Sequence, residues 1–186
     1  MCGIAGFISA TSGRCTTQSF SESLDLMTHR GPDDEGIWSD EIAMLGSRRL
    51  SIIDLGGGKQ PMEDVSGRYV ITFNGAIYNF PELRRELEQQ GASFRTRSDT
   101  EVILESYKLF GENCVNKLNG MFAFAIWDKQ NQTLFAARDR LGVKPFYFFH
   151  KASTLAFASE IKSLLAMPNL ERKVDWNSLA YFFTYN

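Results

Sequence analysis

The sequence has very few histidines and cysteines. His29 and His150 are the only histidines among 186 residues, so a metal site built from several histidines is excluded, and no Cys/His/Asp cluster has zinc spacing. Cys2, Cys15 and Cys114 form no CxxC pair, which indicates reduced thiols rather than a disulfide framework. Nucleophilic chemistry must therefore use one of two imidazoles or find its base elsewhere.

The sequence also lacks long apolar runs and a strong net charge. No stretch reaches the ~18 apolar residues of a membrane span, and the N-terminus has no basic region typical of a signal peptide. We therefore expect a cytoplasmic protein without a membrane partner. The net charge of −2 argues against a generally basic nucleic-acid binder. A length of 186 residues with 44% hydrophobic residues fits one globular domain.

The hydrophobic patterns predict a layered α+β fold. Residues 120–127 are apolar at every position, so both faces of that strand should be covered. Helices and strands are largely segregated, which favours two mainly antiparallel sheets between helix layers. The expected strands cover residues 3–9, 69–73, 120–127, 133–137, 146–149 and 155–158, with Asn74-Gly75 ending the second. The expected helices cover residues 17–28, 81–90, 98–110 and 175–183. Pro81 suits the first turn of the second helix, and Ser98 with Glu101 has the Ser-x-x-Glu form of a capping box at the start of the third. The last helix ends in an apolar pattern without a polar tail, so we expect more protein to follow.

Cys2 is the first candidate for chemistry. A small residue behind Met1 is typical of sequences from which Met is removed, and removal would place a free α-amino group beside the thiol. Such amines titrate near about 7.7–8.0, which suits a general base. The amine can then take the thiol proton, as it does for terminal Thr nucleophiles. The alternative is that Cys2 is simply a small residue in a buried strand.

Two further sets of residues are candidates for substrate binding. Asn74-Gly75 offers a side-chain amide and a backbone N–H, the usual parts of an oxyanion hole, although Asn-Gly is also a common turn dipeptide. Arg49 can bind a carboxylate bidentately and Asp99 can accept from an ammonium group. Each can equally form a surface ion pair, and Asp99 also suits a helix start. Spacing alone leaves these alternatives open.

Taken together, the motifs resemble the glutaminase domain of class II (N-terminal-nucleophile) glutamine amidotransferases, and within them the asparagine synthetase branch. The resembling segments cover nearly the whole chain in the family's order. They are MCGIAGF (1–7), HRGPDDEG (29–36), SRRLSIIDL (47–55), KQPM (59–62), FNGAIYN (73–79), SDTEVIL (98–104), LNGMFAFAIWD (118–128) and ARDRLGVKPFYF (137–148).

The resemblance implies a four-layer αββα sandwich and a role for each candidate residue. Cys2 would attack the side-chain amide of glutamine with its own amine as base, and Asn74 and the Gly75 N–H would hold the oxyanion. Arg49 would bind the substrate carboxylate and Asp99 its ammonium group. The backbone of Leu50, Ser51, Ile52 and Ile53 would line the pocket. Water would then release glutamate from the thioester.

The chain departs from the family at two points. Ala76 stands where the family motif has a Glu that shares the substrate ammonium group with Asp99, so we expect weak glutamine binding or an inactive site. The ATP-dependent synthetase domain is absent, so ATP and Mg are expected only there, and no metal or cofactor in residues 1–186. We expect a glutaminase domain that supplies ammonia to a C-terminal synthetase domain or a separate subunit, for aspartate or another activated acid.

Two alternatives to an active glutaminase remain open. One is a structural or docking module whose pocket has decayed at Ala76. The other is a different terminal-nucleophile hydrolase, such as a peptide amidase, which Arg49 and Asp99 disfavour because they suit a free amino acid. The sequence leaves a homodimer open.

Overall fold

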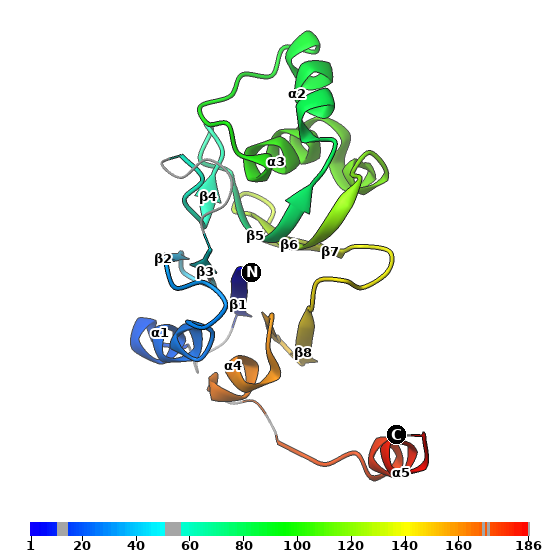
Figure 1. Cartoon of the computed structure of the whole chain (residues 1–186). Helices are drawn as coiled ribbons and strands as arrows, with labels where there is room; N and C mark the ends of the chain where they lie inside the picture. Colours follow the sequence, from blue (N-terminus) through cyan, green and yellow to red (C-terminus); the bar gives the residue numbers. More distant parts are fainter. Residues whose placement is uncertain (11–14, 51–56, 169, 171, 186) are drawn as a thin grey trace.

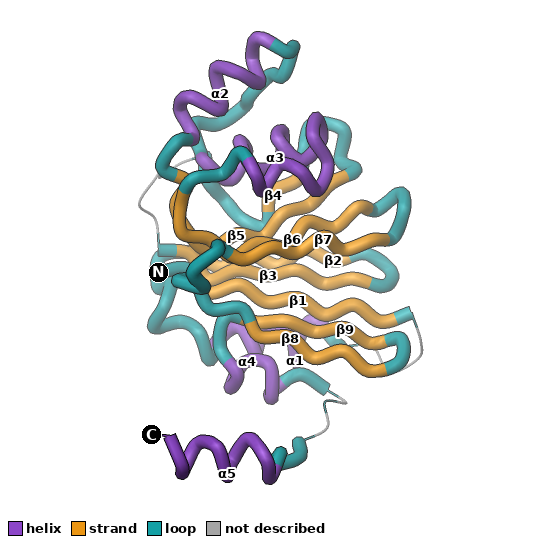
Figure 2. Tube along the Cα trace, turned by 90° about the vertical axis from the view of Figure 1, so that its right-hand side faces the viewer, coloured by secondary structure: helices purple, strands orange, loops and turns teal. Residues whose placement is uncertain are grey.

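The computed structural model describes residues 1–10, 15–50, 57–168, 170 and 172–185. Two antiparallel sheets stack face to face, and helices cover their outer faces (Figures 1 and 2). The predicted α+β sandwich of four layers is therefore confirmed. Ser51, Ile52 and Ile53 lie outside the described residues.

The first sheet has five strands and carries the N-terminus. In spatial order they are β2 (Asp34–Ser39), β3 (Ala43–Arg49), β1 (Gly3–Ser9), β9 (Thr154–Ala158) and β8 (Tyr147–Lys151). Strand β1 lies between β3 and β9, and Gly3 pairs with Arg48. Continuing that antiparallel register places Cys2 opposite Arg49.

The second sheet has four strands. In spatial order they are β4 (Met62–Glu63), β5 (Tyr69–Ile77), β6 (Gly120–Asp128) and β7 (Thr133–Arg138). Strand β6 shows why its sequence does not alternate. Phe122, Phe124 and Ile126 face the helices, whereas Ala123, Ala125 and Trp127 pack toward the first sheet. Both faces are buried, as the apolar run predicts.

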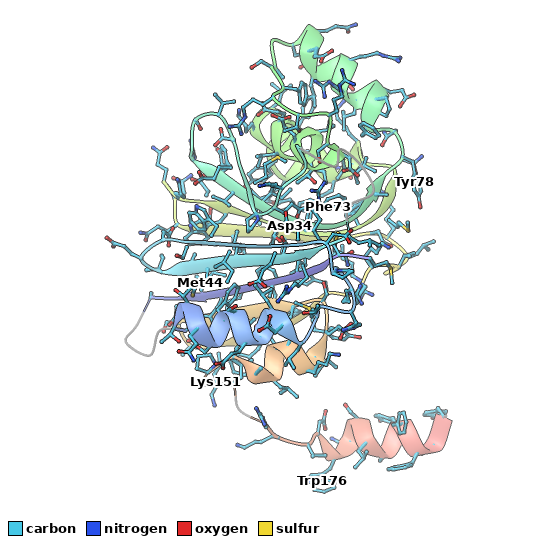
Figure 3. All side chains as sticks on the ribbon, turned by 60° about the vertical axis from the view of Figure 1, so that its left-hand side comes forward. Asp34, Met44, Phe73, Tyr78, Lys151 and Trp176 are labelled. Atoms are coloured by element: carbon cyan, nitrogen blue, oxygen red, sulfur yellow. The ribbon has the colours of Figure 1, made fainter. Side chains whose placement is uncertain are left out.

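Helices form the two outer layers, and Figure 2 shows them on opposite sides of the paired sheets. α1 (Thr17–Asp25) and α4 (Ile161–Ala166) cover the first sheet. α2 (Phe80–Gln89), α3 (Asp99–Phe110) and the following 3-10 turn η1 (Gly111–Asn116) lie beyond the second sheet. Phe73, labelled in Figure 3, lies on the face of β5 that packs toward α3.

The contact between the sheets joins β5 to β1 and β3. The Thr72 hydroxyl donates to the Gly46 carbonyl oxygen at 3.0 Å, which ties β5 to β3 across the interface. Trp127 is buried between the sheets, and its indole N–H donates to Asp40 Oδ2 at 2.7 Å. This bond satisfies the polar atom that burial of a Trp would otherwise leave unpaired.

The helix α5 (Trp176–Tyr185) projects away from the sandwich (Figures 1 and 3). None of its described side chains is buried, and Trp176 is 74% exposed. The sequence correctly predicts this helix, which ends two residues later than expected. Among the described residues, no helix combines the length and apolar character needed to cross a membrane.

Several expected boundaries were wrong. The strand expected over 69–73 continues to Ile77, because all nine of its residues pair with β6. The first helix ends at Asp25 rather than residue 28. Residues 34–39 form β2, although residues 29–36 look like a polar turn, and the short helix α4 carries too little periodicity to be foreseen.

Candidate active site

The candidate residues gather at one cavity of about 140 Å³ at the end of the interface between the sheets. Cys2, Arg49, Leu50, Asn74, Gly75, Ala76 and Asp99 line this cavity. These residues come from four separate regions of the chain: the start of β1, the end of β3, strand β5 and the N-terminus of α3. The expectation that they form one site therefore agrees with the fold.

Cys2 lies directly before β1 and is anchored by its neighbours. The Leu50 N–H points to Cys2 Sγ at 3.4 Å, and Sγ lies 3.7 Å from the Leu50 carbonyl oxygen. On the other side, Arg30 Nε donates to the Cys2 carbonyl oxygen at 3.0 Å. These contacts fix the backbone of Cys2 while the residue stays partly exposed toward the cavity.

Asn74 and Gly75 lie within β5 and not in a turn. Asn74 pairs with Ala123 and Gly75 with Phe122. A Cβ at Gly75 would collide with the Met121 carbonyl oxygen, so the close approach of β5 to β6 requires glycine there. The turn alternative for Asn-Gly is therefore wrong, and sheet pairing explains why the dipeptide is placed here.

The Asn74 side chain has a property unusual for a buried amide. The residue is 1% exposed, yet neither Oδ1 nor Nδ2 has a hydrogen-bond partner within the described part of the chain. A buried polar group without a partner costs about 1–3 kcal/mol. Such an amide at the wall of a cavity is suited to donate to a bound ligand, as an oxyanion hole requires.

Asp99 begins α3 and closes the cavity beside β5. Its Oδ2 accepts the Ile77 N–H at 3.1 Å. Burial raises the pKa of Asp99, although backbone N–H groups of Ile77, Thr100 and Asp99 itself oppose this effect. A bound ammonium group would stabilise the ionised carboxylate in this position. Arg49, also buried, supplies the opposite charge at the same cavity.

Ser98 caps α3 differently from the sequence prediction. Its hydroxyl accepts the Thr100 N–H at 3.1 Å, so the cap itself is confirmed. The expected capping box with Glu101 does not form, because the Glu101 carboxylate accepts the backbone N–H groups of Arg95 and Thr96 at 2.9 and 2.7 Å. The two carboxylates at the start of α3 therefore have different roles. Asp99 lines the cavity, and Glu101 binds the backbone of the preceding loop.

Sequence reasoning missed two polar residues at the cavity, Gln60 and Lys144. Gln60 Oε1 accepts the Phe73 N–H at 2.7 Å and its Nε2 donates to the Thr100 hydroxyl at 3.2 Å. Both residues lie in segments that resemble the family, KQPM and ARDRLGVKPFYF. That resemblance was the available signal, but it gave neither residue a role.

Both histidines belong to the described part of the chain, and neither lines this cavity. His29 Nε2 lies 2.8 Å from Glu160 Oε1 on an exposed side of the molecule. His150 is exposed in β8. A base for Cys2 must therefore come from another group. Within the described ranges, no group of three or more His, Cys, Asp or Glu residues is arranged to hold a metal ion.

The comparisons first define the class of fold. A Bacillus subtilis glutamine phosphoribosylpyrophosphate amidotransferase superposes with a TM-score of 0.72, covering 91% of this chain and 44% of that chain at 22% identity. A second solved structure, described as the allosteric regulatory enzyme of purine biosynthesis, gives the same TM-score at 23% identity. The chain thus shares the fold of these two solved structures.

Sequence comparison then gives the family. Residues 1–186 match the glutamine amidotransferase domain, and the chain belongs to this family. The glutamine-hydrolysing asparagine synthetase 3 of Bacillus subtilis is 43% identical over 98% of this chain and 30% of its own length. A putative glutamine-hydrolysing asparagine synthetase 2 of Methanocaldococcus jannaschii is 39% identical over 95% of this chain and 37% of its own length. The chain thus spans about a third of these relatives.

Proposed function

We propose that this domain hydrolyses the side-chain amide of glutamine to glutamate and ammonia. The observation that carries the proposal is the cavity itself: a thiol at Cys2, an unpartnered buried amide at Asn74, and opposite charges at Arg49 and Asp99 line one space. Free glutamine offers one matching group for each of them. Its carboxylate fits Arg49, its ammonium group fits Asp99 and its amide fits Cys2 with Asn74.

The proposed reaction begins once Met1 has been removed. The α-amino group of Cys2 takes the proton from the thiol, and the thiolate attacks the amide carbon of glutamine. The electron pair of the carbonyl bond moves to oxygen, where the Asn74 amide and the Gly75 N–H stabilise the negative charge. The protonated amine then gives its proton to the leaving nitrogen. Ammonia departs, and water hydrolyses the Cys2 thioester to glutamate.

We further propose that the ammonia serves amide synthesis, as the names of the asparagine synthetase relatives suggest. In this proposal an ATP- and Mg-dependent synthetase domain, or a separate subunit, activates aspartate or another carboxylic acid. The glutaminase domain itself uses neither metal nor nucleotide. Leu50 lines the proposed glutamine pocket; Ser51, Ile52 and Ile53, whose backbone the sequence predicts for the same pocket, lie outside the described residues.

The intact mass of the purified chain tests the proposal. A diazo-ketone analogue of glutamine should add once to a chain that lacks Met1, and free glutamine should protect against the adduct. Cys2→Ala is the matched variant, since it removes Sγ and should give no adduct and no glutamate release. Cys114→Ala should label like the wild type, because Cys114 is buried away from the cavity. A trimmed wild-type chain that forms no adduct and releases no glutamate would refute the proposal in favour of an inactive module.

A further inference from the structure

Lys144 is buried at the same cavity as Cys2, and the mechanism above gives it no role. It lies in the loop between β7 and β8 and is 4% exposed. Its Nζ lies 3.1 Å from the Sδ atom of Met1. Within the described part of the chain, its ammonium group makes no ion pair with a carboxylate within 4.0 Å. A lysine buried in this way is unusual unless it is paired.

The loop holds Lys144 in place through Asp139. The Asp139 carboxylate accepts the backbone N–H groups of Phe122, Val143 and Lys144 at 3.2, 2.8 and 3.0 Å. Arg138 adds a hydrogen bond from its Nε to the Lys144 carbonyl oxygen at 2.5 Å. The position of Lys144 is therefore fixed by the backbone of β6 and of its own loop, so its ammonium group remains at the cavity without a side-chain ion pair of its own.

A second cation, Arg30, contacts the backbone of Cys2. Arg30 Nε contacts the Cys2 carbonyl oxygen, and Arg30 also pairs with Glu160 Oε1 at 3.2 Å. His29 and Lys162 share that same carboxylate. Glu160 therefore offsets the charge of Arg30, whereas Lys144 has no such ion pair, and an ionised Cys2 thiol and the Asp139 carboxylate favour its ammonium form. Burial lowers the pKa of Lys144, and the nearby charge of Arg30 lowers it further.

We propose that Lys144 acts as a positioning residue that keeps the α-amino group of a trimmed Cys2 neutral and basic. The inference rests on the proposed function, because it concerns the same nucleophile. Lys144 and Cys2 line the same cavity and interact electrostatically, so removal of Met1 would place the new amine at the cavity that holds the Lys144 ammonium group. Two like charges at close range disfavour each other, so the amine would hold its proton less tightly than an exposed α-amino group does.

The other charges around Cys2 do not cancel this effect. Arg49 lines the cavity and adds positive charge there, whereas Arg30, which contacts the Cys2 carbonyl oxygen, is paired with Glu160. Asp99 lines the opposite wall, where the substrate ammonium group is proposed to bind. Lys144, to which no carboxylate is paired within the described residues, therefore adds positive charge at the cavity that the new amine would share. A neutral amine can accept the thiol proton at neutral pH, whereas an ammonium group cannot.

The pH dependence of kcat/KM for glutamine on the trimmed chain tests this role. Lys144→Met removes the charge at similar length, and Lys144→Arg keeps it. We expect the acidic limb of the Lys144→Met profile to move up by about one pH unit, the low end of the shift that a close charge produces. Activity should recover at high pH, and Lys144→Arg should keep the wild-type limb. Lys117→Met, which removes a charge paired with Glu86 on the far side of α2, should change nothing.

Three outcomes of these measurements would overturn the inference. A uniform loss at every pH in Lys144→Met would mean a structural role, and a rise in KM without a shifted limb would mean direct contact with glutamine. Loss of activity in Lys144→Arg with an unshifted Lys144→Met limb would likewise contradict a role that depends on charge.

A second measurement needs no variant and no turnover. The rate of acetylation of the α-amino group in the trimmed wild type, followed by mass spectrometry against pH, gives the midpoint of its protonation. We expect a midpoint below the ordinary range of about 7.7–8.0. A midpoint inside or above that range refutes the inference. Because this assay uses no glutamine, it still decides the question if the wild type hydrolyses none and the proposed function fails.

Discussion

Replacing Ala76 with glutamate should strengthen glutamine binding. Ala76 lines the cavity, and the next residue, Ile77, donates its N–H to the Asp99 carboxylate. Residues 74 and 76 of β5 point to the same face of the sheet, because successive side chains alternate. A carboxylate at position 76 would therefore share the cavity with Asn74 and reach the substrate ammonium group beside Asp99.

The size of the effect follows from one added contact. A hydrogen bond to a charged group contributes about 1.5–3 kcal/mol, which corresponds to a ten- to hundredfold lower KM at about 1.4 kcal/mol per tenfold. We expect kcat to change little, because the ammonium group is bound equally in the ground state and the transition state. The change should thus be confined to KM and should depend on the charge of the new side chain.

The same substitution should cost stability without the ligand. A second carboxylate beside the buried Asp99 adds like-charge repulsion, so Ala76→Glu should melt lower than Ala76→Gln in the absence of glutamine. Saturating glutamine should reverse that order. Initial rates of glutamate release and melting curves with and without glutamine measure both effects. The reasoning is refuted if Ala76→Glu leaves KM unchanged, or if Ala76→Gln lowers KM to the same extent.

Two further predictions concern groups outside the cavity. Burial raises the pKa of Asp64, but hydrogen bonds from the Ser66 hydroxyl, the Tyr69 N–H and other donors outweigh it and lower the pKa to about 2. Its contribution to stability is therefore complete above about pH 4 and lost as pH falls toward 2. Asp64→Asn should lower the denaturant midpoint at pH 7 and lose that difference at pH 2; a constant difference would contradict this. Burial raises the pKa of the Cys114 thiol to about 12, so brief iodoacetamide treatment at pH 8 should label Cys2 and spare Cys114, as peptide masses would reveal.

The strands and helices were predictable where local chemistry decides them. The apolar run from Gly120 to Trp127 predicts a strand that is covered on both faces. In the structure this strand packs against helices on one face and against the first sheet on the other. Pro81 lies in the first turn of α2 and Ser98 caps α3, as the sequence predicts. Propensity failed at Asn74-Gly75, because nine consecutive pairs with β6 outweigh the turn preference of two residues.

The site could not be assembled from spacing. Cys2 meets Arg49 only because β1 and β3 pair in one particular register, and it meets Asn74 only because two sheets stack. Neither the register of the strands nor the stacking of the sheets produces a periodic pattern in the sequence. The family resemblance predicted which residues form one site, but only for those residues to which the family gives a role.

Neither residue spacing nor the family resemblance predicts a role for Lys144. From the sequence, a lysine in a polar loop is predicted to be solvated, because most lysines are exposed. Here the Asp139 carboxylate binds three backbone N–H groups and turns the loop so that Lys144 faces the nucleophile. The feature that makes Lys144 notable is the lack of a carboxylate partner in a buried position, and this can be recognised only from the packed structure. Burying the Lys144 ammonium group near the future N-terminus without a carboxylate partner costs stability. A purely structural role for Lys144 does not explain that cost.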